Sequence, residues 1–252
     1  MKRRDLIISI ISVAVLLLLW YLAALFTGSS IILPSPVEVL SSLKRLFSSP
    51  AFFSDVSSTV LRALRSFVLI TLCGAALGVA AGSNRDFETA MRVPVTLLKA
   101  TPVMSVILLA YIWFRTGTVP VFASFLMAFP VMFVQTLQGM HNLDAGLVQM
   151  CSVYEIRGVK KLLNFTLPAL VPSLITGAKQ CLAMIWKVVI ASEVLTIPQS
   201  GVGRGLQLAQ IRLDTASVFA WTVVAVILTF AGDILFDLLL KKSLSGRYGN
   251  AS

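Results

Sequence analysis

Long apolar runs separated by short polar segments dominate the chain. Six such runs stand out, at about residues 6–26, 60–82, 94–114, 119–139, 168–195 and 216–240. A helical run of roughly 20 residues crosses the hydrocarbon core of a bilayer and satisfies its own backbone hydrogen bonds. The pattern therefore predicts an all-α membrane protein with six transmembrane helices.

The first apolar run follows Lys2, Arg3 and Arg4 and so resembles a signal peptide. The apolar region of a signal peptide is only ~7–15 residues long, and no small-residue cleavage site follows here. We therefore expect a membrane helix with its N-terminus inside. After two prolines that end it, apolar residues recur at helical spacing over residues 37–48, which predicts a helix lying in the outer interface.

Local features mark the second and third runs. Arg62 and Arg65 stand in the first turn predicted for the second span, and its glycines favour close helix packing. Residues 83–92 are predicted to be a short charged loop. Thr101-Pro102 interrupts the third run, and a proline inside a helix kinks or breaks it. Such a break either lines a cavity or is a packing kink.

The composition agrees with a bilayer as the solvent. The 252 residues are 57% hydrophobic and 13% charged, with a mean hydropathy of +0.90 and a net charge of +10. In six spans with the N-terminus inside, eleven Lys and Arg residues fall on the cytoplasmic side and five to seven outside. The charge thus reflects topology and not nucleic-acid binding. The three cysteines are widely separated and predict neither a disulfide nor a metal site.

The longest polar interval between apolar runs spans residues 140–167. It carries Arg157, Lys160 and Lys161. Apolar residues also recur there at roughly helical spacing: Leu147, Met150, Cys151, Tyr154 and Val159. One apolar stripe between two membrane spans favours a short helical platform at the cytoplasmic face that docks a partner protein. The alternative is an ordinary solvated loop with a helical turn or two.

The sequence lacks the short motifs that are typical of nucleotide binding, metal binding or nucleophilic catalysis. There is no G-x-x-x-x-G-K-[ST] phosphate cradle, no HExxH, no CxxC and no Ser/His/Asp set. Gly201, Gly203 and Gly205 form only a weak echo of a nucleotide fingerprint, which we interpret as flexible turn glycine. We expect no catalytic residue and no metal ligand.

Ionisable residues inside the spans are the most informative polar positions. Lys187 follows Trp186 midway along the fifth span, and Glu193 lies near its outer end. Charges in a membrane are costly, so they face protein or water and mark pathways. Together with the break in the third span, the candidate pathway residues are Thr101, Pro102, Trp186, Lys187 and Glu193. Lys187 attracts an anionic solute, or alternatively forms a structural ion pair with Asp233.

The chain resembles a permease subunit of type I binding-protein-dependent ABC importers. The resemblance rests on several stretches: Leu33-Pro34-Ser35-Pro36, Lys99-Ala100-Thr101-Pro102, Ile112-Trp113-Phe114, Leu167–Ser173, Ala191–Leu195 and Ser200–Gly203. Within that superfamily it is most similar to the aliphatic sulfonate, taurine and nitrate branch, with related thiamine-precursor and riboflavin-type systems.

The defining signature of such permeases is an E-A-A triplet, a glycine after a three-residue gap, and a later L-P pair. Aligned on Leu167-Pro168, the triplet falls on Gln149, Met150 and Cys151, and the glycine on Glu155. The core letters of the signature are therefore replaced here. By this alignment the loop that couples to an ATPase contains Gln149, Met150, Cys151, Tyr154, Glu155, Gly158 and Lys160. We expect Tyr154 to anchor the contact.

The resemblance implies the partners and the mechanism. It implies a separate cytoplasmic ABC ATPase, which holds ATP and Mg²⁺, an extracytoplasmic solute-binding protein and a second permease subunit, expected to be another copy of this chain. The location would be a bacterial plasma (inner) membrane, in contact with lipid and with both termini in the cytoplasm. The permease core would span residues 56–241, between an N-terminal helical segment, 1–55, and a polar tail, 242–252.

Two other classes of function are compatible with a polytopic membrane protein. A self-sufficient secondary transporter or channel predicts internal repeats with charges in matching halves, and the sequence shows no convincing repeat. A membrane enzyme predicts polar catalytic residues clustered near one interface, and none is found. An ATP-driven importer of a small solute, for which Lys187 favours an anion, is the main expectation.

Overall fold

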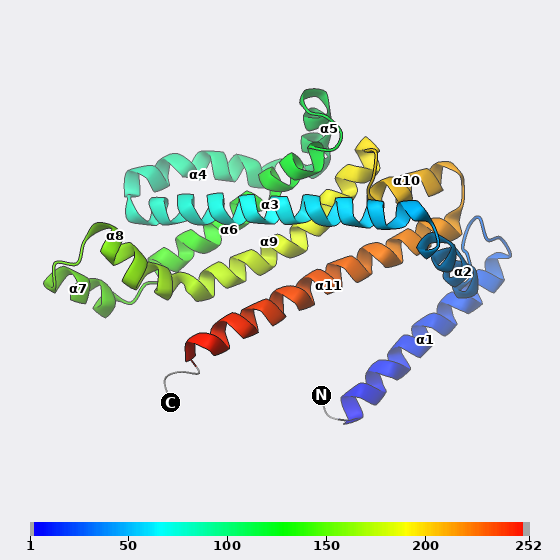
Figure 1. Ribbon diagram of the computed structural model, residues 1–252, viewed down its shortest axis with the longest axis horizontal. Coiled ribbons are helices and arrows are strands. Elements are labelled where there is room, and N and C mark those ends of the chain that lie inside the picture. Colours follow the sequence, from blue (N-terminus) through cyan, green and yellow to red (C-terminus); the bar gives the residue numbers. More distant parts are fainter. Residues whose placement is uncertain (1–2, 249–252) are drawn as a thin grey trace.

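The computed structural model describes residues 3–248, and these fold almost entirely into helices (Figure 1). In chain order they are α1 (Arg3–Thr27), α2 (Pro36–Phe47), α3 (Pro50–Ser83), α4 (Arg85–Ala100), α5 (Val103–Trp113), α6 (Val119–His141), α7 (Ala145–Val153), α8 (Gly158–Lys161), the π-helix η1 (Leu162–Thr166), α9 (Leu167–Thr196), α10 (Val202–Ile211) and α11 (Thr215–Tyr248). Among these residues five helices are long and apolar enough to cross a membrane, and the number is six if the bent α4–α5 pair is counted as one span. The predicted all-α membrane architecture is confirmed.

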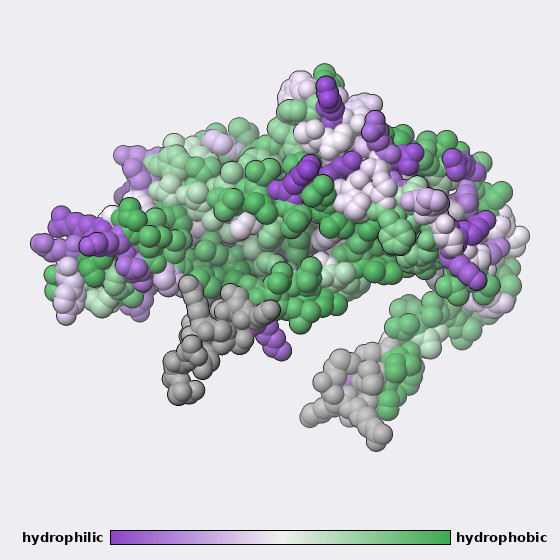
Figure 2. Space-filling model, in the orientation of Figure 1, coloured by the Kyte–Doolittle hydropathy of each residue, from purple (hydrophilic) through white to green (hydrophobic). Residues whose placement is uncertain are grey.

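Polar residues gather at the two ends of the long axis. Figure 2 shows hydrophilic residues over α7 and α8 at one end, and over α2 and the top of α5 toward the other, with a broad hydrophobic belt between them. We call these the platform end and the α10 end. A belt of this kind faces lipid, so the long axis lies roughly along the membrane normal.

The core is built from α3, α6 and α9, which pack lengthwise against one another. Ile70, Met132 and Ile185 are fully buried where the three helices meet. Gly74 and Gly78 of α3 lie against α6, where an added Cβ would come within 2.6 Å of side-chain atoms of Met132 and Thr136. The sequence predicted this close approach of two helices correctly.

Helix α1 stands away from the core (Figure 1). Only 6% of its apolar stretch, Ile10–Thr27, is buried inside the protein. It is tied at its C-terminal half, where Trp20 stacks on Phe219 and donates from Nε1 to the Pro34 carbonyl at 3.1 Å. The predicted interfacial helix is present as α2, with Val37 and Leu40 exposed on one side and Val39 buried on the other.

Two predicted boundaries are wrong on α3 and α4. Helix α3 already begins at Pro50, so Arg62 lies several turns inside the helix and not in its first turn. The loop predicted for residues 83–92 is instead helical from Arg85, because the Asn84 side chain accepts from two backbone amides and starts α4 within one residue of α3. Helix α3 consequently runs without a break across residues 55 and 56, between which the sequence analysis placed the start of the permease core.

The third span is broken at the predicted place. Helices α4 and α5 meet at an angle of 99° on either side of Thr101-Pro102. Thr101 bonds back to the Leu97 carbonyl through Oγ1 at 2.7 Å, and Pro102 is the first residue beyond it. Since proline lacks an amide hydrogen, it cannot continue the helix, and the chain turns sharply.

The polar segment between α9 and α11 contains a helix that the sequence did not predict. Residues 202–211 form α10, and the glycines interpreted as flexible turn lie packed within it or at its start. A Cβ on Gly203 would meet the Glu193 side chain at 2.6 Å, and Gly205 lies directly against the Trp221 ring. These glycines are required by close packing, which leaves no spacing signal in the sequence.

Candidate functional site

The platform consists of α7, a turn and α8. Asp144 caps the start of α7 by accepting from the Leu147 amide at 3.0 Å. The helix ends in a Schellman motif, in which the Ile156 amide donates to the Cys151 carbonyl at 2.8 Å and the Glu155 amide to Ser152 at 3.2 Å. Glu155 therefore adopts a left-handed backbone, with φ of +51°, which non-glycine residues seldom adopt.

The predicted single apolar stripe on the platform is divided in two. Cys151 is buried, at 1% exposure, and faces the protein. Tyr154 and Val159 are 73% and 68% exposed, and Val153 of α7 is exposed beside them. Cys151 and Tyr154 already differ in exposure on the N-terminal side of the turn at Glu155, and that turn then separates Val159 from the helical periodicity of α7.

The remaining predicted coupling residues all lie on this platform. Gln149 is exposed on α7, Met150 is partly covered, and Lys160 is exposed on α8. Gly158 has a φ of +59°, so a glycine is conformationally suited to the start of α8. Through η1 the platform continues into α9 without a gap.

Lys187 lies in an open groove between α9 and α11. The groove has a volume of about 500 Å³ and is lined by Lys187, Ile190, Ala191, Thr222, Ala225, Val226, Thr229 and Phe230. The alternative pairing of Lys187 with Asp233 does not occur, and Lys187 forms no ion pair with any residue in the described part of the chain.

Trp186 faces the opposite side of the same helix pair. It is 5% exposed and lies against Gly232 of α11, where an added Cβ would come within 2.6 Å of Nε1. This Nε1 is buried with no acceptor among the described residues. An apolar cavity of about 170 Å³ adjoins it, lined by residues of α3, α9 and α11. Trp186 and Lys187 thus serve different surfaces although they are neighbours in sequence.

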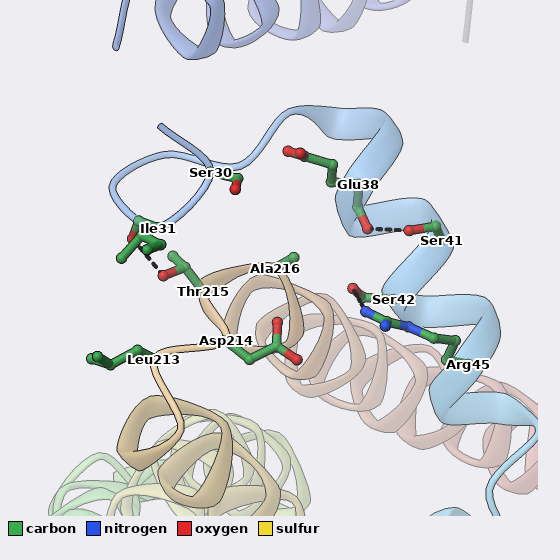
Figure 3. A pocket seen from close by; sticks show the side chains of 10 residues that line it. All are labelled: Ser30, Ile31, Glu38, Ser41, Ser42, Arg45, Leu213, Asp214, Thr215 and Ala216. Atoms are coloured by element: carbon green, nitrogen blue, oxygen red, sulfur yellow. Dashed lines mark hydrogen bonds between the residues drawn. The ribbon is translucent and has the colours of Figure 1, made fainter. Parts of the chain in front are cut away.

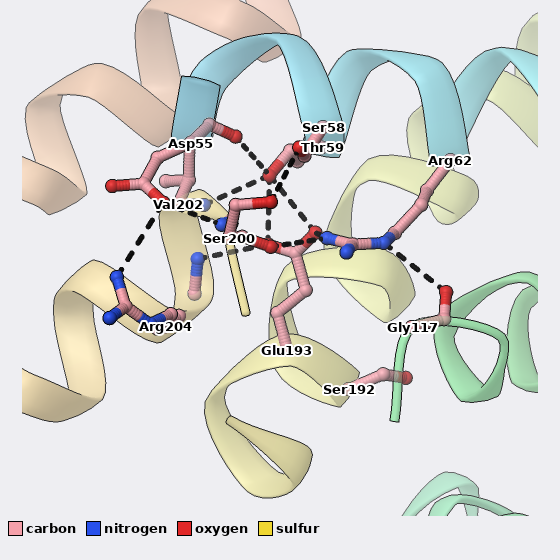
Figure 4. Close-up of polar contacts among 12 residues, drawn as sticks. Asp55, Ser58, Thr59, Arg62, Gly117, Ser192, Glu193, Ser200, Val202 and Arg204 are labelled. Carbon is pink, nitrogen blue, oxygen red and sulfur yellow. Dashed lines mark hydrogen bonds and ion pairs between the residues drawn. The ribbon is translucent and has the colours of Figure 1, made fainter. Parts of the chain in front are cut away.

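Glu193 lies at the centre of a buried polar cluster at the α10 end (Figure 4). Its side chain is fully buried and forms an ion pair with Arg62 Nη1 at 2.6 Å. Thr59 donates to the carboxylate at 2.8 Å, and the Gly203 amide donates at 3.0 Å. Glu193 therefore bridges α3 and the first turn of α10, and its carboxylate is closed to solvent.

The same cluster caps α10 and fixes the loop before it. The Gly201 amide donates to Asp55 at 2.8 Å and the Val202 amide to Thr59 at 2.9 Å, so side chains satisfy the first amides of α10. Arg62 also donates to the carbonyls of Ser200, at 2.7 Å, and Gly117, at 3.3 Å. We call this set, Asp55, Thr59, Arg62, Glu193 and residues 200–203, the α10 clamp. Sequence analysis singled out Glu193, Arg62 and Gly203 but did not predict that they contact one another.

A smaller polar pocket opens at the α10 end between α2 and the turn before α11 (Figure 3). It encloses about 230 Å³ and is lined by Ser30, Ile31, Glu38, Ser41, Ser42, Arg45, Leu213, Asp214, Thr215 and Ala216. Thr215 closes one side by donating to the Ile31 carbonyl at 2.6 Å. Both acidic and basic groups border the opening, which suits contact with a polar surface. No group of three or more potential metal ligands exists among the described residues.

The geometry is that of a helical membrane protein with a projecting platform, and comparison with known proteins identifies the family. A family described as binding-protein-dependent transport system inner membrane components matches residues 71–244, more than half of the chain. The chain belongs to this family of importer permeases.

Related permeases cover nearly the whole chain. The SsuC protein of Bacillus subtilis, described as an aliphatic sulfonates transport permease, is 26% identical over 93% of this chain and 85% of its own length. The taurine transport permease TauC of Escherichia coli is 24% identical over 90% and 85%. The solved MetNI methionine ABC transporter shares the fold, with a TM-score of 0.66 over 76% of this chain and 95% of that chain, at 16% identity.

The backbone at Glu155 agrees with the signature alignment predicted from Leu167-Pro168, which assigns a glycine to this position. The φ of Glu155 is left-handed, a conformation that glycine adopts without steric cost. Glutamate holds the same turn here.

Proposed function

We propose that this permease imports a small anionic solute by alternating access, driven by a separate ATPase that docks on the platform. One observation carries the proposal. Helix α9 joins the platform directly through η1 and also carries Lys187 midway along its length. A displacement of the platform therefore moves the wall of the groove that holds the free ammonium group.

The ATPase contact is assigned to the exposed apolar group at the turn of the platform. Tyr154, Val153 and Val159 project from the protein, with Arg157 and Lys160 exposed beside them. A few aromatic and apolar anchors surrounded by charge are typical of the energetic centre of an interface. Cys151 has the opposite role, because its burial holds the platform in place.

The solute pathway is assigned to the α9–α11 groove. An anion is favoured because Lys187 is exposed and lacks a partner within the described residues. Thr222 and Thr229 border the same groove and supply hydroxyl oxygens. The aliphatic sulfonate, taurine and nitrate permeases among its relatives support this class of solute.

Of the other predicted pathway residues, Thr101 and Pro102 shape the bend that brings α5 against α9. Trp186 is assigned to packing against α11. Glu193 is assigned to holding the α10 clamp and not to contacting solute, because its carboxylate is closed to solvent.

The proposed topology places the platform and both termini in the cytoplasm and the α10 end outside. The excess of Lys and Arg on the platform side supports this orientation. A solute-binding protein would then meet the α10 end, where the polar pocket of Figure 3 opens. The second permease subunit is proposed to be another copy of this chain.

Reconstitution of the permease with its ATPase and binding protein tests the proposal. We expect ATP-dependent uptake, which Tyr154→Ala reduces together with ATPase retention, whereas Tyr21→Ala on the lipid-exposed α1 leaves both unchanged. Lys187→Met is expected to abolish preference for methanesulfonate over the neutral methanesulfonamide. Uptake by the chain alone without an ATPase, or an unchanged solute profile in Lys187→Met, would refute the corresponding part.

A further inference from the structure

Polar residues lie on one side of the α9–α11 helix pair. On α11, Thr222, Thr229, Asp233 and Asp237 fall within roughly a quarter of the helix circumference at ~100° per residue. On α9, Thr176, Lys179, Gln180 and Lys187 also share a face, all of them exposed. The opposite side of the same pair is the apolar cavity beside Trp186.

A row of polar residues across the hydrophobic belt is costly against lipid even though Ala183 and Val226 lie between its members, so it faces water or protein. This row runs from the Lys187 groove toward the platform. At its lower part Lys179 pairs with Asp237, at 2.7 Å from Nζ to Oδ1 and 3.0 Å to Oδ2. Both oxygens of the carboxylate therefore lie against one ammonium group.

Two of the interhelical ion pairs, Arg62–Glu193 and Lys179–Asp237, differ in their exposure. The side chains of Arg62 and Glu193 are 12% and 0% exposed, and hydrogen bonds hold them. The side chains of Lys179 and Asp237 are 48% and 55% exposed. They do not line the groove, but they lie on the faces of α9 and α11 that continue from it toward the platform. The first pair is closed, whereas the second is open to exchange.

We propose that Lys179 is a second anion subsite of the pathway and that Asp237 occupies it until the solute displaces it. This inference rests on the proposed anion pathway through the groove. A sulfonate or nitrate presents two oxygens to a cation much as a carboxylate does, so Asp237 stands in for the solute's acid group. Lys187 is eight residues away, about 12 Å along the helix.

Internal competition gives the subsite a function. Two unpaired lysines along one pathway would hold an anion strongly and slow its release. With Asp237 bound to Lys179, Lys187 is the lysine of this pathway that has no ion-pair partner among the described residues, and Lys179 becomes available only by exchange of partners. Asp237 therefore favours passage of the anion toward the platform end over its retention.

Access of water-soluble reagents to the pair tests its location. In a background lacking Cys73, Cys151 and Cys181, Asp237→Cys in the assembled complex is expected to react severalfold faster with an anionic than with a cationic methanethiosulfonate. Adding Lys179→Met should remove that preference. Leu238→Cys, on the adjacent exposed apolar position, serves as the control that reacts with neither. Absence of reaction at position 237, or absence of charge preference there, overturns the subsite.

Binding and uptake test the competition itself. Without ATP, the Asp237→Asn complex is expected to retain methanesulfonate about tenfold more tightly, since an ionic hydrogen bond is freed. Its ATP-driven uptake should be slower, and methanesulfonamide should be unaffected. Asp86→Asn, in an exposed turn far from the groove, is the matched substitution expected to change nothing.

The outcomes separate the two proposals. If Lys187→Met removes anion preference while Asp237→Asn behaves as Asp86→Asn, the second subsite is wrong and the proposed function stands. If the unmodified complex does not distinguish methanesulfonate from methanesulfonamide, the anion pathway and the subsite both fail.

Discussion

Removing Arg62 while keeping Glu193 isolates the energetics of the α10 clamp. Glu193 is fully buried, and Arg62 supplies its only cationic partner within the described residues, at 2.6 Å. Arg62→Met leaves the carboxylate with donors from Thr59 and Gly203 but with no compensating charge. Breaking a buried pair in this way costs about 3–5 kcal/mol, because the remaining charge stays desolvated.

The double variant Arg62→Met/Glu193→Gln removes both charges. It loses the hydrogen bonds of Arg62 to the carbonyls of Ser200 and Gly117, each worth about 1 kcal/mol. We therefore expect the double variant to be more stable than Arg62→Met by about 1–3 kcal/mol, although it carries one more substitution.

Reversible unfolding by SDS titration in mixed micelles measures these free energies. Arg65→Met is the matched control, since Arg65 is exposed on the same helix with no ion pair among the described residues, and its effect should stay within about 0.5 kcal/mol. The reasoning is refuted if the double variant is no more stable than Arg62→Met. Thr59 and Gly203 would then suffice to hold the Glu193 carboxylate without Arg62.

Three further predictions concern the platform, the core and the α10 end. Glu155→Gly should stabilise the platform turn by about 0.5–1 kcal/mol, because glycine adopts a positive φ without steric cost. The expected result is slower hydrogen exchange at the amide of residue 156. An unchanged exchange rate contradicts the prediction. Gly78→Leu should lower the free energy of SDS unfolding by about 1–3 kcal/mol, because the leucine pushes α3 away from Thr136 of α6. Ala76→Leu, at an exposed position of the same helix, should leave it unchanged. Equal stabilities of the two variants would show that α6 moves to accept the leucine at no cost. Burial raises the pKa of the Asp214 carboxyl, but the hydrogen bonds from Ser217 and two nearby arginines outweigh it, so that this pKa lies below its usual value. The ionised Asp214 therefore stabilises the folded protein above its unfolded pKa of about 3.9, and this stabilisation is lost as the pH falls through the lower pKa of the folded state. Hydrogen exchange of the amides at the start of α11 should accelerate over this pH range in the wild type and not in Asp214→Asn.

The platform illustrates how far a local pattern can be interpreted. Its position between two apolar spans, its helical content and its exposed Tyr154 follow from residue types that lie close together in the chain. The left-handed turn at Glu155 does not, because glutamate gives no sign of it. The turn is closed by the Schellman hydrogen bonds, and it places Val159 outside the periodicity of α7, whereas tertiary packing buries Cys151 and leaves Tyr154 exposed.

The sequence alone determined the membrane class, the spans and the break at Thr101-Pro102, because hydrophobic length and missing amide hydrogens act locally. Only the tertiary structure decided which charges are neutralised and which remain available. Glu193 meets Arg62 across 131 positions, and Lys179 meets Asp237 across 58. Such pairings depend on the rotation of one helix against another, which no single helix encodes, and they leave Lys187 without an ion-pair partner among the described residues.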